Sequence, residues 1–296
     1  MSGDRDPPFF ADRRALRLNF EKAATTFTSA DALHREIGSR MAERLELVKL
    51  EPAWIVDLGC GIGADFPALA RRFPRASIMG VDFAVAMARR AAPALPAWQR
   101  WLTRNRPKAV CADMAALPLA TNGFELAWSN LALHWLDDPE PAVREAQRIL
   151  CPGGLFMFSS LGPDTLGELR DVCREALGSG VHVRSFIDLH DLGDLLGRAG
   201  FAAPVMDMER ITLTYPDAAG LVADLRKSGS GNAMRGRSRG LLSRAAGQRF
   251  AGAAQRAMRD GRLAVTFEVI YGHAWKGAPR RTASGDAIVN FIPRRK

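Results

Sequence analysis

The stretch Trp54-Ile-Val-Asp-Leu-Gly-Cys-Gly-Ile-Gly-Ala-Asp-Phe66 decides the fold of this chain. It opens as an apolar run of strand character that ends at Asp57, and it closes where apolar residues begin to recur at helical spacing. Between these parts, glycines stand at alternate positions, namely Gly59, Gly61 and Gly63. The order strand, glycine-rich turn, helix is typical of the first βα unit of a nucleotide-binding fold. Glycine suits such a turn because it adopts unusual φ and ψ angles and lets the backbone approach a ligand closely.

The glycine spacing separates this turn from the dinucleotide fingerprint, which reads G-x-G-x-x-G. Here the pattern is D-x-G-x-G-x-G, and it resembles motif I of the Rossmann-like S-adenosylmethionine (SAM) methyltransferases. SAM has no pyrophosphate, and its amino-acid part carries an ammonium that suits a carboxylate or a turn carbonyl. The resemblance implies that SAM is bound by Asp57 and by the turn containing Gly59, Cys60, Gly61 and Gly63. A purely structural glycine turn is the alternative.

A second acidic residue strengthens the SAM interpretation. Ser77 to Asp82 reads as the next strand, and Asp82 lies 19 residues beyond Gly63. A carboxylate near that distance from the glycine turn can accept hydrogen bonds from both hydroxyls of a ribose. We therefore predict that Asp82, with Phe83 beside it, contacts the ribose, and that a helix follows to Ala92.

Two further strands predict the rest of the cofactor site. Asp113 and Met114 end a short third strand, and in SAM sites of this type an acid here receives the adenine amino group while an apolar neighbour lies against the ring. The fourth strand, Phe124 to Trp128, is followed by Asn130 and His134. These two residues are expected at the carboxyl end of the sheet, where open α/β folds bind ligands.

Composition sets the limits on class and domain organisation. A chain of 296 residues with 47% hydrophobic and 25% charged residues can build a sizeable core. We expect residues 1–50 to form an N-terminal extension, loose up to residue 18 and then helical, that covers a methyltransferase domain over residues 51–296. Within that domain we expect a basic insertion at about 216–262. A short irregular or helical insert is expected over 93–107.

Hydropathy and cysteine usage favour a cytoplasmic protein. No apolar run approaches the roughly 18 residues of a membrane span, and no secretory signal is evident at the N-terminus. The four cysteines are scattered without metal-ligand spacing, which is typical of reduced thiols in a cytosol, and no metal site is expected.

The net charge of +9 comes almost wholly from arginine. It reflects either genome composition or an acidic partner, which could be nucleic acid, an anionic membrane or an acidic protein. The densest basic cluster holds Arg226 with Lys227, and then Arg235, Arg237 and Arg239. No N-P-P-[YF] tetrapeptide of nucleic-acid methyltransferases follows the fourth strand, so nucleic acid is not the expected partner.

Several segments together resemble one family, the malonyl-[acyl-carrier protein] O-methyltransferases that start pimelate assembly for biotin. The likeness covers roughly Asn19 to Trp275, and its pieces are Leu117–Thr121, Phe124–Leu131, Arg148–Gly154, Asp164–Leu169 and a variable-region signature at Leu225–Asn232. The resemblance implies a mostly parallel seven-stranded α/β sheet with helices on both faces, N-terminal helices and a C-terminal helical insertion. It also implies SAM as methyl donor and malonyl-acyl-carrier protein as acceptor. We expect a monomer that needs neither membrane nor nucleic acid.

Two departures keep other functions open. Phe27 stands where the family commonly has a tyrosine near the acceptor pocket, so a hydroxyl contact is missing or another residue makes it. The stretch Asp191 to Phe201 also resembles the complex I assembly factor that hydroxylates an arginine, a protein with the same SAM-binding fold. A small-molecule methyltransferase, for example one acting on quinones, is the third possibility.

The expected chemistry requires little from the protein beyond alignment. A malonyl carboxylate is ionised at neutral pH because carboxylic acids titrate near pH 4, so no general base is required. His134 is the candidate base, with a role in shaping the substrate site as the alternative. Arg226, or another arginine of the basic cluster, is the candidate to hold the acceptor carboxylate, since a guanidinium matches carboxylate geometry. A solvated basic loop is the alternative for each of them.

Overall fold

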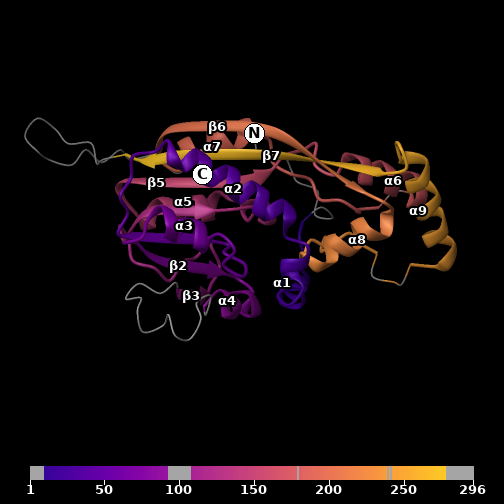
Figure 1. The fold of residues 1–296 in the computed structure, drawn as a ribbon, viewed down its shortest axis with the longest axis horizontal. Coiled ribbons are helices and arrows are strands. Elements are labelled where there is room, and N and C mark those ends of the chain that lie inside the picture. Colours follow the sequence, from indigo (N-terminus) through magenta and orange to yellow (C-terminus); the bar gives the residue numbers. More distant parts are fainter. Residues whose placement is uncertain (1–9, 93–107, 179, 239, 241, 278–296) are drawn as a thin grey trace, which may run out of the picture.

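The computed structural model describes residues 10–92, 108–178, 180–238, 240 and 242–277 of the chain. These residues form one seven-stranded sheet in the order β3-β2-β1-β4-β5-β7-β6 (Figure 1). The strands are β1 (Trp54–Leu58), β2 (Ser77–Asp82), β3 (Lys108–Cys111), β4 (Phe124–Ser129), β5 (Leu150–Leu161), β6 (Phe201–Tyr215) and β7 (Leu263–Lys276). Strand β7 runs antiparallel to β5 and β6, and the other neighbours pair in parallel. The predicted mostly parallel seven-stranded sheet is confirmed.

Helices occupy the connections between the strands and the segment before β1. They are α1 (Arg13–Ala23), α2 (Ala32–Glu46), α3 (Phe66–Arg72), α4 (Val85–Ala91), α5 (Glu140–Ile149), α6 (Gly167–Leu177), α7 (Leu189–Arg198), α8 (Ala218–Lys227) and α9 (Arg244–Ala257), with short 3-10 turns η2 (Phe27–Ser29) and η4 (Leu133–Trp135). Figure 1 shows α6, α8 and α9 gathered at one end of the long antiparallel pair β6–β7. The sequence prediction for residues 93–107 lies outside the described residues.

The central strands of the sheet are covered on both faces, which explains why β1 and β4 are apolar along most of their length. In β1, Ile55 packs with α2 and α3 on one face, whereas Val56 packs with α5 and α7 on the other. Both side chains are fully buried. This alternation is that of a parallel sheet in a three-layer α/β fold.

The strand order places a crevice at the carboxyl ends of β1 and β4. The chain moves outward from β1 through β2 to β3, and then returns to the other side of β1 with β4. Ligands bind at such a switch point in open α/β sheets. The loops that follow β1, β2, β3 and β4 therefore meet at one place, and they carry the predicted cofactor residues.

The expectation that residues 1–18 are loose was wrong from Arg13 onward. Helix α1 begins there because the Asp12 side chain caps it, accepting a hydrogen bond of 3.1 Å from the Ala15 amide. Leu16 of this helix is buried. The N-terminal segment is therefore a packed part of the fold close to the crevice.

Within the described residues, no helix combines the length and the apolar character needed to cross a membrane.

Candidate active site

The glycine-rich turn after β1 is fixed to the end of β2. The amides of Gly59 and Cys60 both donate to the Val81 carbonyl, at 2.7 and 3.0 Å. Gly59, Gly61 and Gly63 all have a positive φ, at 79°, 53° and 77°, which favours glycine. The backbone conformation alone therefore accounts for three glycines at alternate positions.

The surroundings of these glycines differ. A Cβ at Gly59 would collide with the Ala132 side chain, and one at Gly63 would lie 2.8 Å from the Phe66 ring. A Cβ at Gly61 would meet no atom within 4 Å. Gly61 is therefore the glycine whose missing side chain leaves space open beside the backbone.

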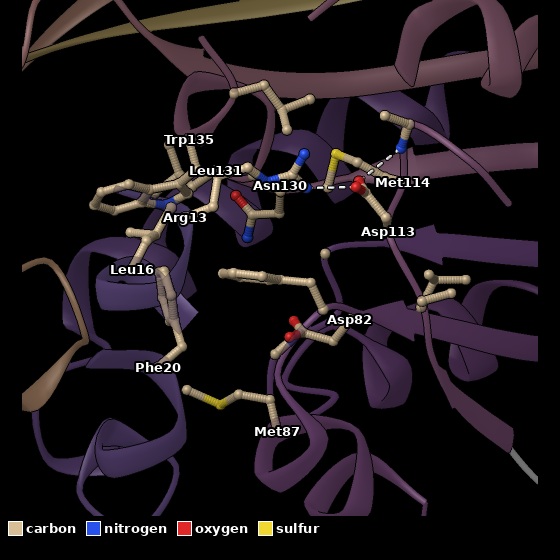
Figure 2. A pocket seen from close by; sticks show the side chains of 18 of the residues that line it. Arg13, Leu16, Phe20, Asp82, Met87, Asp113, Met114, Asn130, Leu131 and Trp135 are labelled. Carbon is tan, nitrogen blue, oxygen red and sulfur yellow. Dashed lines mark hydrogen bonds and ion pairs between the residues drawn. The ribbon is translucent and has the colours of Figure 1, made fainter. Parts of the chain in front are cut away.

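That space belongs to a cavity of about 300 Å³ at the carboxyl ends of the parallel strands. The predicted site residues that line it are Gly59, Gly61, Asp82, Phe83, Asp113, Met114 and Asn130. The N-terminal segment closes the other side, with Arg13, Leu16, Phe20, Phe27 and His34. Figure 2 shows Leu16 and Phe20 of α1 facing Asp82 and Asp113 across the cavity.

Asp57, Cys60 and Gly63 do not line this cavity. Asp57 is buried in β1, and burial first, then the charges of Asp65 and Asp82, raise its pKa well above the usual value. Cys60 packs against β2, where a Cβ on Gly80 would lie 2.6 Å from its Sγ. The roles predicted for these residues at the cofactor stay predictions.

Asp82 is held between the glycine turn and α4. Its Oδ2 accepts from the Gly61 amide at 2.9 Å, and its Oδ1 accepts from the Ala84 amide at 2.8 Å. Burial raises the pKa of Asp82 to about 6, against the opposing effect of these hydrogen bonds. Each carboxylate oxygen has a second acceptor position, so this side chain can still accept two hydroxyl groups from a diol.

Asp113 is engaged by the N-terminal helix. Its Oδ1 accepts from the Ala115 amide at 3.0 Å, and its Oδ2 forms an ion pair with Arg13 of α1. Both residues lie at the edge of the cavity, and Met114 stands next to them (Figure 2). Asp113, predicted to receive the adenine amino group, thus lies in the cavity lining with a cation beside it, and its role stays a prediction.

Asn130 connects four parts of the fold behind the cavity wall. Its Nδ2 donates to the His34 carbonyl at 3.0 Å and to the Asp65 carboxylate at 3.1 Å, while its Oδ1 accepts from the Ser159 hydroxyl at 2.8 Å. Asp65 also accepts from the Trp128 indole at 2.9 Å. Because both amide hydrogens of Asn130 are used, its side chain fixes the wall and α2 in place.

Neither candidate catalytic residue from the sequence lines the cavity. His134 is buried in η4, where its ring packs 4.9 Å from Trp135 and 5.7 Å from Phe186 between ring centroids. Burial first, and then the positive charge of Arg184, lower its pKa well below the usual value. The imidazole is therefore neutral at neutral pH. Arg226 is exposed in the last turn of α8.

The basic cluster is not the single patch that its sequence suggests. Arg237 forms an ion pair with Asp12 at 3.1 Å and donates to the Met234 carbonyl at 2.8 Å. Arg235 is exposed, and Arg239 lies outside the described residues.

Three charged or polar side chains at or beside the cavity were not predicted from the sequence. They are Arg13 and His34 of the N-terminal segment and Arg184 of the loop before α7. Arg184 is only 10% exposed, and its Nη2 lies 2.9 Å from the Asp137 carboxylate, which lines the cavity. Arg13 and His34 line the cavity from α1 and α2. No local motif marks these residues, because each reaches the crevice through long-range packing.

The cavity fits SAM on three observations from this chain. The space beside Gly61 is open, Asp82 retains acceptor positions for a ribose, and Asp113 with Met114 offers an acid and an apolar side chain. These are the chemical groups that a nucleoside with a charged amino-acid tail requires.

Comparison with known proteins agrees with this geometry. Residues 56–158 match the model of a methyltransferase domain family. The fold is similar to that of the YcgJ protein from Bacillus subtilis, with a TM-score of 0.55, 16% identity and coverage of 82% of this chain and 99% of that one. At this identity, the likeness concerns the fold alone.

Comparison with full-length relatives identifies a narrower family than the domain match does. The chain is 43% identical to a malonyl-[acyl-carrier protein] O-methyltransferase from Gallionella capsiferriformans, over 95% of this chain and 97% of the relative. It is 45% identical to the protein of the same name from Laribacter hongkongensis, over 96% of this chain and 97% of the relative. This chain belongs to the malonyl-[acyl-carrier protein] O-methyltransferase family. It is a SAM-dependent O-methyltransferase, and the predicted family and cofactor are confirmed.

Proposed function

We propose that this chain methylates the free carboxylate of a malonyl group held as a thioester on acyl-carrier protein. The observation that carries the proposal is full-length similarity to relatives named for that activity, at 43–45% identity. The resemblance noted in the sequence implies that the methyl ester then primes pimeloyl assembly for biotin. The hydroxylase and quinone alternatives are not favoured, because the likeness to the carboxyl methyltransferases spans nearly the whole chain.

SAM, when bound, supplies a methyl group carried on a sulfonium sulfur. We assign the ribose to Asp82 with Phe83, the adenine to Asp113 with Met114, and the amino-acid part to the turn around Gly59 and Gly61. Asp57, Cys60, Gly63 and Asn130 support that turn and the wall opposite it. The acceptor carboxylate is already ionised, so its methylation releases no proton and no side chain has to accept one. The protein contributes alignment and exclusion of water.

We infer that Arg184 holds the acceptor carboxylate. It is largely buried next to the cavity, and its partner Asp137 lies in the cavity lining. A malonyl carboxylate can take the place of the Asp137 oxygen on the guanidinium fork, at little cost in desolvation. Arg226 was the sequence candidate, but its exposed position on α8 suits the surface of a protein partner better.

We assign the carrier-protein surface to the exposed sides of α1 and α8. Arg14, Arg17 and Lys22 are exposed on α1, and Arg226 with Lys227 on α8. Just after α1, the Thr26 hydroxyl donates a hydrogen bond of 3.0 Å to the Lys227 carbonyl at the end of α8. Leu16 and Phe20 of α1 line the cavity, so a positive surface borders its opening. An acidic carrier protein is the partner that this charge favours.

We further propose that the chain works as a monomer in the cytoplasm, with neither nucleic acid nor membrane as a partner. The scattered cysteines support this location, because they show no disulfide framework. Light scattering of the purified protein, with and without SAM, tests the monomer.

Methyl transfer from labelled SAM tests the acceptor directly. The protein is incubated with malonyl-carrier protein, acetyl-carrier protein and a malonyl thioester of a short pantetheine analogue. We expect label on both malonyl compounds and none on the acetyl carrier, which has no free carboxylate. Label on the acetyl carrier would contradict carboxyl methylation. Failure of all three acceptors, with SAM still bound, would contradict the proposed substrate class.

A further inference from the structure

Arg184 and Asp137 form a largely buried ion pair at the edge of the cavity. The Nη2 atom of Arg184 lies 2.9 Å from Oδ1 of Asp137, and the two side chains are 10% and 24% exposed. Arg184 comes from the loop before α7, which is fixed where the Asn232 side chain donates to the Val181 carbonyl at 2.7 Å. Asp137 follows η4 and lines the cavity. The acid therefore lies on the cavity side of the pair.

A second donor holds Asp137 in its place. The Ala11 amide donates to both oxygens of its carboxylate, at 3.0 and 3.1 Å. Ala11 is itself buried and forms an antiparallel β-bridge with Met234. Because this amide remains as a partner, Asp137 can keep its position when the Arg184 guanidinium turns to another carboxylate. The ion pair can thus open without releasing the N-terminal segment.

The proposed reaction removes the charge that Arg184 is assigned to bind. The methyl group moves from the sulfonium sulfur to a carboxylate oxygen, so that a C–O bond forms while the C–S bond breaks and its electron pair stays on sulfur. The sulfonium becomes a neutral thioether, the carboxylate becomes a neutral ester, and no proton is released. A largely buried guanidinium is costly without an anion beside it. Formation of the ester therefore favours the return of Arg184 to a carboxylate of the protein.

We propose that Asp137 competes with the acceptor carboxylate for Arg184. It holds the guanidinium in the empty enzyme, gives it up to the substrate, and takes it back once the neutral ester has formed. Asp137 thereby limits the affinity for the acceptor and weakens the hold on the product. The inference rests on the proposed carboxyl methylation and on Arg184 as the residue that binds the acceptor.

The sign of one measured effect separates this competition from a purely structural ion pair. If the pair only fixed the loop before α7, loss of the Asp137 charge would weaken acceptor binding, because Arg184 would lose its position. If Asp137 competes, the same loss strengthens the binding of an anionic acceptor. The second effect is the less common result of breaking a buried ion pair, which makes it informative.

Calorimetry with unreactive acceptor analogues provides the test. Asp137→Asn removes the charge and keeps a side-chain oxygen that can accept from the Ala11 amide. The ligands are pantetheine analogues that carry, through an amide, a malonyl group, its methyl ester or an acetyl group. They are titrated at saturating S-adenosylhomocysteine, so that no methyl transfer occurs.

We expect Asp137→Asn to bind the malonyl analogue about tenfold more tightly than wild type does, the effect of removing one competing charged partner. The methyl ester should also bind more tightly, by a smaller factor, because a neutral oxygen then has access to the guanidinium. The affinity for the acetyl analogue should stay unchanged. In steady-state assays with a malonyl thioester, KM should fall while kcat does not rise, because the competition is over before the methyl group moves.

Asp138 provides the matched control for the loss of one charge at this part of the chain. Its Oδ1 accepts from the Glu140 amide at 2.9 Å, at the start of α5. Asp138→Asn should leave all three affinities as in wild type. Equal gains in the two variants would overturn the proposal, because only the summed charge near the cavity would then matter.

Arg184→Met separates this inference from the function on which it rests. The variant should lose affinity for the malonyl analogue. If it does, but Asp137→Asn binds that analogue no more tightly than wild type, the competition is overturned and the acceptor assignment stands. If Arg184→Met and wild type bind the malonyl analogue alike, the assignment of Arg184 to the acceptor fails, and the competition fails with it.

Discussion

At the scale of residues, the three glycines of the turn have a common backbone conformation but different surroundings. Only at Gly61 does an added Cβ point into open space within the cavity. We therefore predict that Gly61→Ala lowers SAM affinity by about tenfold or more, because the methyl group occupies space that the ligand needs. Isothermal titration measures this loss.

Backbone strain has to be separated from loss of space at this position. Gly153 has a φ of 82°, and a Cβ added there also meets no atom within 4 Å, but it lies outside the cavity lining. Gly153→Ala should lower the free energy of unfolding by about 1–3 kcal/mol, as expected for a positive φ in a residue with a side chain, without changing SAM affinity. Equal affinities for the Gly61 and Gly153 variants would contradict the assignment of the turn.

The second residue-scale prediction concerns proton transfer. His134 is buried, and burial lowers its pKa well below the usual value, while a malonyl carboxylate stays ionised from about pH 6 to 8. We expect kcat at saturating SAM to be nearly independent of pH between about 6.5 and 8. His134→Asn should lower kcat by less than about tenfold, since a general base typically contributes a hundredfold or more. A rate that rises tenfold per pH unit would require a base.

The sequence predicts which residues line the cavity only where their spacing from a strand end or a turn indicates it. Asp82, Asp113 and Gly61 line the cavity, and their places could be predicted because strand ends and turn spacing are local features. Their roles at the cofactor stay predictions. Arg184 and His34 were missed, since their relation to the cavity comes from packing between distant segments. Arg226 was a candidate because it belongs to a dense basic run, and it lies exposed on α8 outside the cavity lining. Its role stays a prediction.

At the scale of elements, α1 and the segment after α8 form a clamp over one side of the cavity. The Asp12 amide donates to the Ala233 carbonyl at 2.8 Å, and the Asn19 amide side chain donates to the Gly231 carbonyl at 3.0 Å. Gly229 has a φ of 82°, and a Cβ there would lie 2.7 Å from the Phe20 ring, which lines the cavity. The position of α1 thus depends on a glycine more than 200 residues away in sequence.

We therefore predict that Gly229→Ala loosens α1. Hydrogen exchange of the amides in residues 13–23 should become faster, and SAM affinity should fall because Phe20 shifts. Gly178 is the control, with a φ of 77° and no atom within 4 Å of an added Cβ, so Gly178→Ala should leave exchange in α1 unchanged. Unchanged exchange in the Gly229 variant would show that α1 is held independently of this segment.

Most of the elements were predictable, because their patterns are local. Strand β2 has the bounds expected from its apolar run. Helix α1 was placed too late, because Leu16 and the Asp12 cap lie in a polar, arginine-rich stretch. The neighbours of α1 could not be predicted at all, since nothing local links it to α8.

At the scale of the whole molecule, a net charge of +9 should steer an acidic carrier protein toward the enzyme. Charge reversal of Arg14, Arg17 and Lys22 on α1 should raise the KM for malonyl-carrier protein by about tenfold or more at low salt and weaken its salt dependence. The KM for a short malonyl-pantetheine thioester should change little. Steady-state rates at two ionic strengths measure both.

The matched control reverses the charge of three exposed arginines elsewhere on the surface. Two of them, Arg71 and Arg72, end α3, and the third, Arg75, follows it. Equal effects of the two triple variants would mean that only overall charge matters. Equal effects of the α1 variant on both acceptors would place these residues in the substrate pocket instead of on the carrier surface.

The central claim is that this chain methylates a malonyl carboxylate on a carrier protein, and intact mass spectrometry of the carrier tests it most directly. Malonyl-carrier protein is incubated with SAM and either wild type or Arg184→Met, and the thioester is then treated with a carboxyl esterase. We predict that wild type adds one methyl group to the malonyl arm, that the esterase removes it, and that Arg184→Met slows the addition strongly while Arg226→Met does not. A carrier whose mass never changes in the presence of SAM-bound wild type would contradict the account.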